Sequence, residues 1–292
     1  METNYYRPRE LEEAAALLEE QEGTVLVNGG SDIILSISAG KITPTGIIDI
    51  RGIKSMNTIT DDGQYVHIGG NVTYRQMQDS PVCGRIGGLA RAAGSVGSPV
   101  IRMVATPAGN IATAAPSADC ASMMLALDTE LVLVSVRGER IVRQKDIYLG
   151  AYKTDIQSNE IIKEMRFPSP GPDKGSGYAR FSRRKSQDIA KVIAGAVVTV
   201  DKKGRCLSAV ISLGALNATA VLAPSIGERI KGLGRDEAIQ LALKFFPREA
   251  GLRESYFKRY KEETTCNAIA EALDMAFAET ERGDSCYACG SL

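Results

Sequence analysis

The chain has 292 residues, of which 44% are hydrophobic and 24% are charged, a composition typical of globular proteins. Its 35 basic and 35 acidic residues give a formal net charge of zero, so no overall field favours nucleic acid or an anionic membrane. The N-terminal residues form no apolar leader, and no run of about 18 apolar residues predicts a membrane-spanning helix. We therefore expect a cytoplasmic protein of about two domains that binds a small molecule or a protein partner, with no nucleic acid and no membrane.

The first part of the chain predicts alternating helices and strands. Apolar residues recur on one face of an expected helix at 8–21, and short strands are expected at 24–27 and 45–50 with a helix between them, as in a small βαβ unit. Further along, strands are expected at 65–70, 130–136 and 160–167, with a turn at 137–139. Short helices are expected near 74–78, 89–93 and 120–127.

Three prolines and a glycine within residues 168–172 cannot continue a helix or a sheet, so we place a domain boundary there. Beyond it, strands at 192–200 and 207–213 flank a turn at 201–204, and helices are expected at 236–246 and 252–277. The second domain is thus predicted as a small antiparallel sheet backed by helices, and the whole chain as an α+β fold.

Two glycine-bearing segments are the most informative feature: Val27-Asn28-Gly29-Gly30-Ser31-Asp32 and Thr106-Pro107-Ala108-Gly109-Asn110. Each is read as a loop that follows an apolar stretch. Glycine lets backbone N–H groups converge on a diphosphate without charged side chains. Neither segment is a G-x-G-x-x-G fingerprint or a P-loop, and either one alone is compatible with a simple tight turn. Together they predict a nucleotide-binding cradle.

The chemistry-bearing residues exclude several enzyme classes. His67 is the only histidine, which rules out a Ser-His-Asp triad and a multi-histidine metal site. Cys83, Cys120, Cys206 and Cys266 are scattered, and Cys286 and Cys289 lie in a polar tail at 286–292. That terminal pair is compatible with a redox pair, or with half of a tetrahedral metal site that a partner subunit completes. We expect no catalytic residue and no metal ligand, so a cofactor must carry any redox chemistry.

Four segments in order resemble the flavoprotein subunits of the molybdenum hydroxylases. They are the N-terminal Tyr-x-Arg-Pro-x-x-Leu-Glu-Glu-Ala pattern, residues 27–32, residues 101–119 with their Ala-Thr-Pro-Ala-Gly-Asn and Pro-Ser-Ala-Asp runs, and Arg-Arg-Lys-Ser-Gln-Asp-Ile-Ala at 183–190. The resemblance implies a two-lobed FAD-binding domain of the vanillyl-alcohol-oxidase/PCMH type over 1–171. Its small lobe would span about 1–55 and its larger lobe about 56–171. A CO-dehydrogenase-flavoprotein-like domain would follow over 172–285.

The resemblance also implies noncovalent FAD and assigns residues to it. Two segments would hold the pyrophosphate and its surroundings: Val25, Leu26, Val27, Asn28, Gly29, Gly30, Ser31 and Asp32, and Thr106, Pro107, Ala108, Gly109 and Asn110. Asp119 would meet a flavin or ribose hydroxyl, although it also suits the N-cap of the helix at 120–127. Ile162 would pack on the adenine, although it also suits a plain core. Arg180 would place a basic group near FAD.

The segment 183–191 has two interpretations. It is either a solvated charged loop or, as in the family, a loop beside the flavin where Arg183, Arg184 and Lys191 would tune its potential. The sequence also departs from the family pattern. Asn28 and Ser31 stand where Ala and Thr are common, Met103 where Asn is frequent, and Ala108 where a glycine is usual.

The implied function is an electron-transferring flavin subunit. Electrons would come from a molybdopterin-binding large subunit through [2Fe-2S] clusters of a small subunit, reach FAD here and leave to an acceptor such as NAD. Xanthine or another purine is the first guess for the substrate, with nicotinate, an aldehyde and carbon monoxide also open. A flavin-binding protein that acts without catalytic partner subunits is the alternative from a different functional class. A covalent-flavin oxidase is disfavoured because His67 and Cys83 are not at tethering positions.

Overall fold

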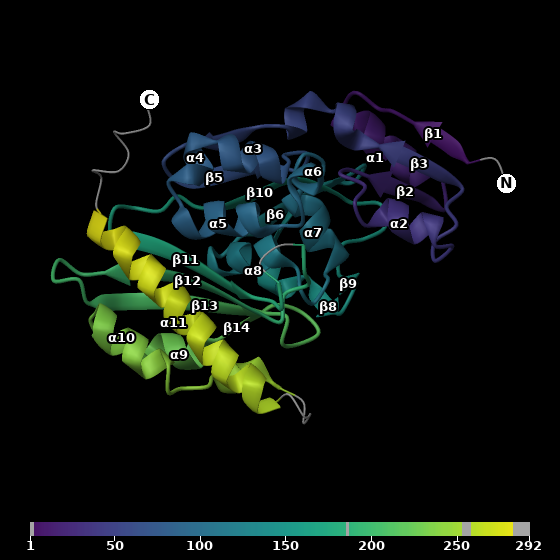
Figure 1. Ribbon diagram of the computed structural model, residues 1–292. Helices are drawn as coiled ribbons and strands as arrows, with labels where there is room; N and C mark the ends of the chain where they lie inside the picture. The colour runs from purple at the N-terminus through teal and green to yellow at the C-terminus, as the bar shows by residue number, and fades with distance from the viewer. Residues whose placement is uncertain (1–2, 185–186, 253–257, 283–292) are drawn as a thin grey trace.

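The computed structural model describes residues 3–184, 187–252 and 258–282, so the predicted tail with Cys286 and Cys289 lies outside the described residues. Figure 1 shows a small N-terminal lobe at one end, a middle lobe of helices and strands, and a C-terminal sheet crossed by a long helix at the other end. The α+β fold expected from the sequence is confirmed. Among the described helices, none is long and apolar enough to cross a membrane.

The small lobe is a parallel three-stranded sheet in the order β1-β3-β2, and the βαβ unit expected there is confirmed. Its helix α1 starts at Leu11 and not at Pro8, and it buries apolar residues at the i, i+3, i+4 and i+7 positions of one face. The strand β1 was missed, since three residues carry no readable alternation. The elements are β1 (Asn4–Tyr6), α1 (Leu11–Glu20), β2 (Thr24–Val27), α2 (Ile33–Ser38), β3 (Gly46–Asp49), η1 (Ile50–Gly52) and η2 (Lys54–Met56).

The middle lobe contains an antiparallel sheet in the order β4-β5-β10-β6-β7. Met165 of β10 lies opposite Ile68 of β5, and Phe167 lies opposite Val66. All four side chains are buried, so one face of the sheet supports the core of this lobe. The strands are β4 (Ile59–Asp61), β5 (Tyr65–Gly69), β6 (Glu130–Ser135), β7 (Gly138–Arg143) and β10 (Ile161–Pro168), with η3 (Gln144–Asp146) and the small pair β8 (Tyr148–Gly150) and β9 (Lys153–Thr154) between them.

Six helices lie between β5 and β6: α3 (Tyr74–Asp79), α4 (Pro81–Gly84), α5 (Gly87–Ser95), α6 (Pro99–Arg102), α7 (Pro107–Thr113) and α8 (Asp119–Ala126). The expectation of a loop at 106–110 is wrong. Thr106 caps α7, with its hydroxyl accepting from the Gly109 N–H, and Pro107 occupies the first helical position. The N-cap role considered for Asp119 is also wrong, because Ala118 holds that position and Asp119 is the first residue of α8.

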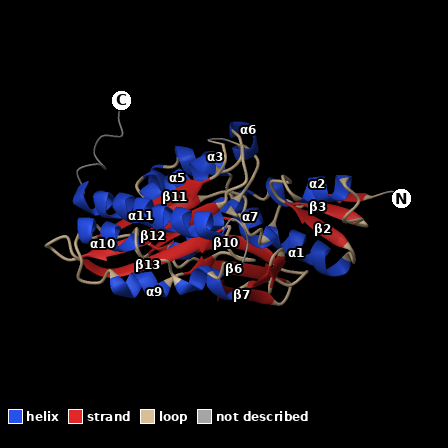
Figure 2. Ribbon diagram, turned by 60° about the horizontal axis from the view of Figure 1, so that its bottom comes forward, coloured by secondary structure: helices blue, strands red, loops and turns tan. Residues whose placement is uncertain are grey.

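The C-terminal sheet is an antiparallel meander of β11 (Lys174–Phe181), β12 (Val192–Val200), β13 (Cys206–Gly214) and β14 (Val221–Leu222). Its two faces belong to different cores: Ala179 packs in the core under the C-terminal helices, and its neighbour Tyr178 packs in the core of the middle lobe. Helix α11 crosses one face (Figures 1 and 2), while α5 and α8 contact the other. The C-terminal helical elements are α9 (Pro224–Arg229), α10 (Arg235–Ala242), η4 (Arg248–Ala250) and α11 (Lys258–Arg282), the last ending five residues beyond the predicted 277.

Candidate FAD site

A cleft of about 640 Å³ is lined by residues of both the small lobe and the middle lobe, and we call it the interlobe cleft. Its volume lies within the range of small-molecule sites. Both glycine-bearing segments contribute to it. The predicted site residues in its lining are Leu26, Asn28, Gly29, Gly30, Ser31, Asp32, Thr106, Ala108, Gly109, Asn110 and Ile162.

The first glycine segment packs directly against Val104 and Ala105, the two residues that precede the second segment. A Cβ atom added at Gly29 would lie 2.3 Å from the carbonyl oxygen of Val104 and 2.8 Å from Cα of Ala105, both backbone atoms. Gly30 has a φ of +73°, in the left-handed region that side chains disfavour. Glycine at 29 thus allows the close approach of two backbone segments, and glycine at 30 allows the bend into α2.

Asn28 ties the first segment to the sheet of the middle lobe. Its Nδ2 donates to the carbonyl oxygen of Gly70 at 2.6 Å, and the Gly70 N–H donates to Lys163 O at 2.8 Å. The adjacent Ile162 is 8% exposed, belongs to the core and lines the cleft. The two interpretations of Ile162, core residue and cleft wall, are therefore compatible.

The second segment is held rigidly by its own side chains. The Thr106 hydroxyl accepts from the Gly109 N–H at 3.1 Å, and Asn110 Oδ1 accepts from the Ala121 N–H at 3.3 Å. Tyr74 N donates to Ala105 O at 3.0 Å, which anchors the preceding residues to α3. These bonds fix the first turn of α7 at the edge of the cleft.

Unpaired backbone donors surround the cleft. Within the described ranges, the N–H groups of Gly29, Gly30, Ser31, Asp32 and Ala108 donate no hydrogen bond. No lysine or arginine occurs among the described residues that line the cleft. A diphosphate placed here would meet free amides and no cationic side chain, as expected for glycine-bearing segments that bind phosphate through their backbone. The residues present therefore fit FAD.

Tyr74 is a cleft residue that sequence reasoning missed. Its side chain is 1% exposed, and its hydroxyl has no hydrogen-bond partner in the part of the chain that the structure describes. Burial raises the pKa of this phenol well above its ordinary value, so it remains a protonated donor. An orphaned buried hydroxyl in a cleft wall is costly unless a ligand satisfies it. The only sequence signal nearby is the capping box of Thr73 and Gln76 that starts α3.

Other lining residues were not predicted because they come from distant segments. They are Ile33, Ser36, Ile42, Ile50, Val96, Ile101, Ala105, Ala112, Thr113, Tyr152, Ile156, Glu160 and Ile161. Most of these are apolar, as a wall for aromatic rings requires. Glu160 is bonded by Arg140 at 2.8 Å, and that guanidinium lowers the pKa of the Glu160 carboxyl. Its negative charge is thus balanced from outside the cleft.

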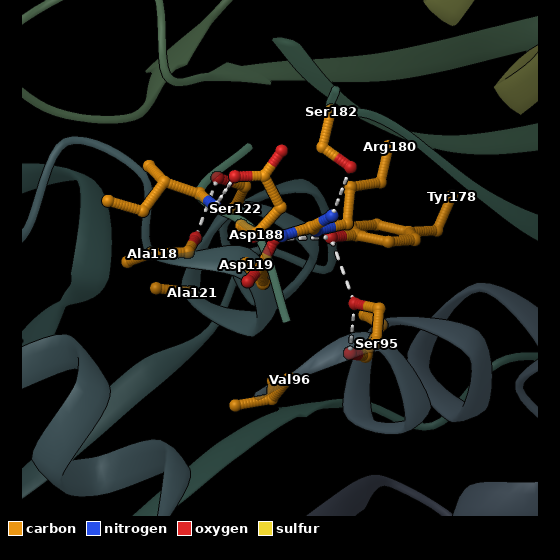
Figure 3. A network of polar contacts seen from close by, with 12 residues as sticks. Ser95, Val96, Ala118, Asp119, Ala121, Ser122, Tyr178, Arg180, Ser182 and Asp188 are labelled. Carbon is orange, nitrogen blue, oxygen red and sulfur yellow. Dashed lines mark hydrogen bonds and ion pairs between the residues drawn. The ribbon is translucent and has the colours of Figure 1, made fainter. Parts of the chain in front are cut away.

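Asp119 and Arg180 are not among the residues that line the cleft. Arg180 Nε donates to Asp119 Oδ1 at 2.7 Å, and the Tyr178 hydroxyl donates to the same oxygen at 3.2 Å (Figure 3). Burial raises the pKa of the Asp119 carboxyl, and the Arg180 guanidinium and the Tyr178 hydroxyl act in the opposite direction. The two residues that the resemblance placed near FAD are therefore paired with each other. Val25, Val27 and Pro107 also lie outside the lining.

The segment 183–191 is charged and open where the structure describes it. The side chains of Arg183 and Arg184 are 77% and 70% exposed, and each lies near Asp188, at 3.9 and 3.7 Å. The Lys191 N–H donates to Phe181 O at 2.7 Å. Neither Arg183, Arg184 nor Lys191 lines the cleft, so their influence on a flavin stays a prediction.

Comparisons with known proteins agree with this geometry. The family model for the FAD binding domain in molybdopterin dehydrogenase matches residues 1–170, and the one for the CO dehydrogenase flavoprotein C-terminal domain matches residues 177–276. The chain is 31% identical to the nicotinate dehydrogenase FAD-subunit of Eubacterium barkeri over 208 residues, 69% of this chain and 70% of that one.

Two further relatives are informative. A putative xanthine dehydrogenase FAD-binding subunit of Escherichia coli strain K12 is 31% identical over 202 residues, 68% of this chain and 69% of its own. A solved carbon monoxide dehydrogenase from Hydrogenophaga pseudoflava superposes with a TM-score of 0.85 at 25% identity, covering 96% of this chain and 98% of that one. The chain therefore belongs to the FAD-binding flavoprotein subunits of the molybdenum hydroxylase family, and its cofactor is FAD.

Proposed function

We propose that this chain accepts electrons from the iron–sulfur clusters of a partner subunit and passes them from FAD to a soluble acceptor such as NAD. The observation that carries the proposal is the interlobe cleft, where unpaired N–H groups of both glycine-bearing segments meet. The relatives named as FAD subunits or medium chains of multi-subunit dehydrogenases support partners for this chain as well. We assign it a molybdopterin-binding large subunit and a small [2Fe-2S] subunit.

The cleft residues have binding roles in this proposal. The amides at 29–32 and that of Ala108 bind the diphosphate, and the Ser31 hydroxyl adds a hydrogen bond. The Tyr74 hydroxyl donates to a polar atom of the cofactor, and Ile162 packs against the adenine. Thr106 and Asn110 hold the first turn of α7 in place. When bound, FAD supplies the hydride and single-electron chemistry that the side chains lack.

No side chain of this chain acts as acid or base on the organic substrate in this account. His67 is bonded to Glu164 at 3.0 Å and to Asp62 at 3.2 Å, and it does not line the cleft. The substrate pocket then belongs to the large subunit. Xanthine or another purine is our first candidate, ahead of nicotinate, an aldehyde and carbon monoxide. The cytoplasmic location and the domain limits at 171 and 285 stay predictions.

Purification of the tagged chain from its native host tests this function. We expect stoichiometric FAD together with co-eluting molybdenum and iron. FAD without either metal would instead indicate a stand-alone flavin-binding protein. Anaerobic addition of xanthine, nicotinate, an aldehyde or carbon monoxide to the complex then identifies the substrate by bleaching of the flavin absorbance. Return of the colour on adding NAD would establish the acceptor, and persistent bleaching would exclude it.

A further inference from the structure

A two-residue turn joins β8 to β9 at the rim of the interlobe cleft, and its second residue is Tyr152. Tyr152 lines the cleft and is 68% exposed, whereas Tyr74, the other tyrosine of the lining, is 1% exposed. Among the described residues, no aromatic or cation–π contact involves the ring of Tyr152. A large aromatic side chain therefore stands open beside the cofactor cleft.

The backbone of Tyr152 is left-handed, with a φ of 59°. Bulky side chains disfavour this region, which glycine adopts freely. The Tyr152 N–H donates to Ala114 O at 2.9 Å, and Ala114 ends α7 with a φ of 49°, so two hydrogen-bonded residues share the uncommon conformation. Strained conformations of this kind gather at binding and catalytic sites. The strain here lies at the rim of the cleft.

Helix α7 sets the distance between Tyr152 and the proposed diphosphate position. The Ala108 amide belongs to the first turn of α7, and Ala114, which holds Tyr152, is the C-cap. At a rise of about 1.5 Å per residue, Ala108 and Ala114 are separated by about 9 Å along the helix axis. Figure 1 shows β8 and β9 beside α7. FAD has an aromatic ring system on each side of its diphosphate, so Tyr152 lies toward one of these ring systems.

The cleft wall beside Tyr152 is mainly apolar. Ile156 follows β9 and lines the cleft together with Ile161 and Ile162, which are 1% and 8% exposed. Glu160, the charged member of this wall, is bonded by an arginine from outside the cleft. Buried isoleucines offer one flat ring face a surface to pack on, and Tyr152 is the exposed aromatic residue available to the other face.

We propose that Tyr152 stacks on the adenine ring of bound FAD and covers it at the rim of the cleft. The inference rests on the proposed function, in which Ile162 packs against the adenine. An aromatic side chain stacks on a base through the π-face that every base has. Stacking also removes apolar area of both rings from water. Tyr152 is then a cofactor-binding residue whose position depends on the left-handed turn.

Two variants separate the ring of Tyr152 from the turn. Tyr152→Asn removes the ring and keeps the turn, because asparagine tolerates the left-handed region. It should bind FAD at least about fivefold more weakly, the lower end of what base stacking contributes. Tyr152→Phe keeps the ring and should bind FAD as the unchanged chain does. The control Leu149→Asn alters an equally exposed residue of the same hairpin that does not line the cleft, and it should leave FAD affinity unchanged.

The affinities come from titration of the FAD-free full chain with FAD, followed by flavin fluorescence, with circular dichroism to confirm folding. The unchanged chain is titrated first. If it holds no FAD, the proposed function itself fails, and this is recognised before any variant is compared.

Nitration with tetranitromethane tests whether FAD covers the ring, and peptide mass spectrometry locates the nitrated tyrosines. FAD should protect Tyr152 in the unchanged chain. Tyr260, which is 56% exposed and lies outside the cleft lining, should be nitrated equally with and without FAD. The visible absorbance of bound flavin should be the same in the unchanged chain and in Tyr152→Asn, because a ring stacked on adenine does not touch the isoalloxazine.

Four results would overturn the proposal. They are unchanged FAD affinity in folded Tyr152→Asn, equal weakening in Tyr152→Asn and Tyr152→Phe, nitration of Tyr152 that FAD does not reduce, and a flavin absorbance that differs between Tyr152→Asn and the unchanged chain. The last result would show that Tyr152 contacts the isoalloxazine and not the adenine.

Discussion

Replacing Gly29 by alanine is predicted to force apart the two segments that form the FAD cleft. The new Cβ would lie 2.3 Å from the Val104 carbonyl oxygen and 2.8 Å from Cα of Ala105. Both neighbours are backbone atoms, so no side-chain rotation relieves the contact. One of the two backbone segments must therefore move, which separates the unpaired amides at 29–32 from that of Ala108.

The expected magnitude follows from overpacking, which costs about 1–3 kcal/mol for a group inserted into a well-packed site. If about half of that cost falls on the cofactor-bound state, FAD affinity decreases about two- to twelvefold, since about 1.4 kcal/mol is a factor of ten. Gly84→Ala is the matched control, because an added Cβ there has no atom within 4 Å and Gly84 has no positive φ.

The assay is titration of the FAD-free chain with FAD, followed by quenching of flavin fluorescence, with circular dichroism to confirm folding. Gly29→Ala should be folded and bind FAD about two- to twelvefold more weakly, and Gly84→Ala should bind as the unchanged chain does. A folded Gly29→Ala chain with unchanged FAD affinity would show that the close contact at Gly29 does not shape the cleft.

Three further changes test separate contacts. Tyr74→Phe removes an unpartnered buried hydroxyl, so the free energy of unfolding without FAD should stay equal or rise by up to about 1 kcal/mol. The FAD affinity should fall about tenfold, because the hydroxyl no longer donates to the cofactor. Unchanged affinity would show that the hydroxyl does not bind FAD. Asn28→Ala removes the bond to Gly70 O and should lower the free energy of unfolding in urea by about 1 kcal/mol, and no loss would contradict a stabilising role. His67 has a pKa above its ordinary 6.5, because its bonds to Glu164 and Asp62 outweigh burial, which lowers it. The contribution of protonated His67 to the free energy of unfolding, up to about 1 kcal/mol, is therefore complete below about pH 6.5 and lost as pH rises through the folded pKa. In urea unfolding, His67→Gln should be less stable than the unchanged chain near pH 6 and equally stable near pH 9. An equal difference at both pH values would contradict this.

Much of the fold was predictable from hydrophobic patterning. Each of four predicted elements appears in the structure: the strands at 24–27 and 192–200 are short apolar runs, the strand at 65–69 alternates, and the helix α1 has one apolar face. The strands β1, β8 and β9 have two or three residues each, too few for a pattern, and they exist because neighbouring strands pair with them.

Three short helices of the middle lobe, α4, α6 and α7, have a sequence signal that hydrophobic periodicity does not reveal. Ser80-Pro81, Ser98-Pro99 and Thr106-Pro107 each place a capping hydroxyl before a proline, and each pair starts a helix. This signal would have replaced the loop expected at 106–110 by the start of α7.

The site was predictable in its two glycine-bearing segments and not in its walls. Tyr74, Tyr152 and Glu160 reach the cleft through tertiary packing of segments far apart in sequence. The departure at Asn28 has a structural reason, since the amide bonds to Gly70 O, which an alanine cannot do. Nothing in the structure explains Ser31 in place of the common threonine.

A crystal structure of the FAD-loaded chain would locate the cofactor directly. We predict the FAD diphosphate between the amides at 29–32 and that of Ala108, with the Tyr74 hydroxyl bonded to the cofactor and no arginine in contact with the FAD phosphates. An FAD diphosphate found away from these amides, for example against the guanidinium groups of Arg183 and Arg184, would contradict this prediction.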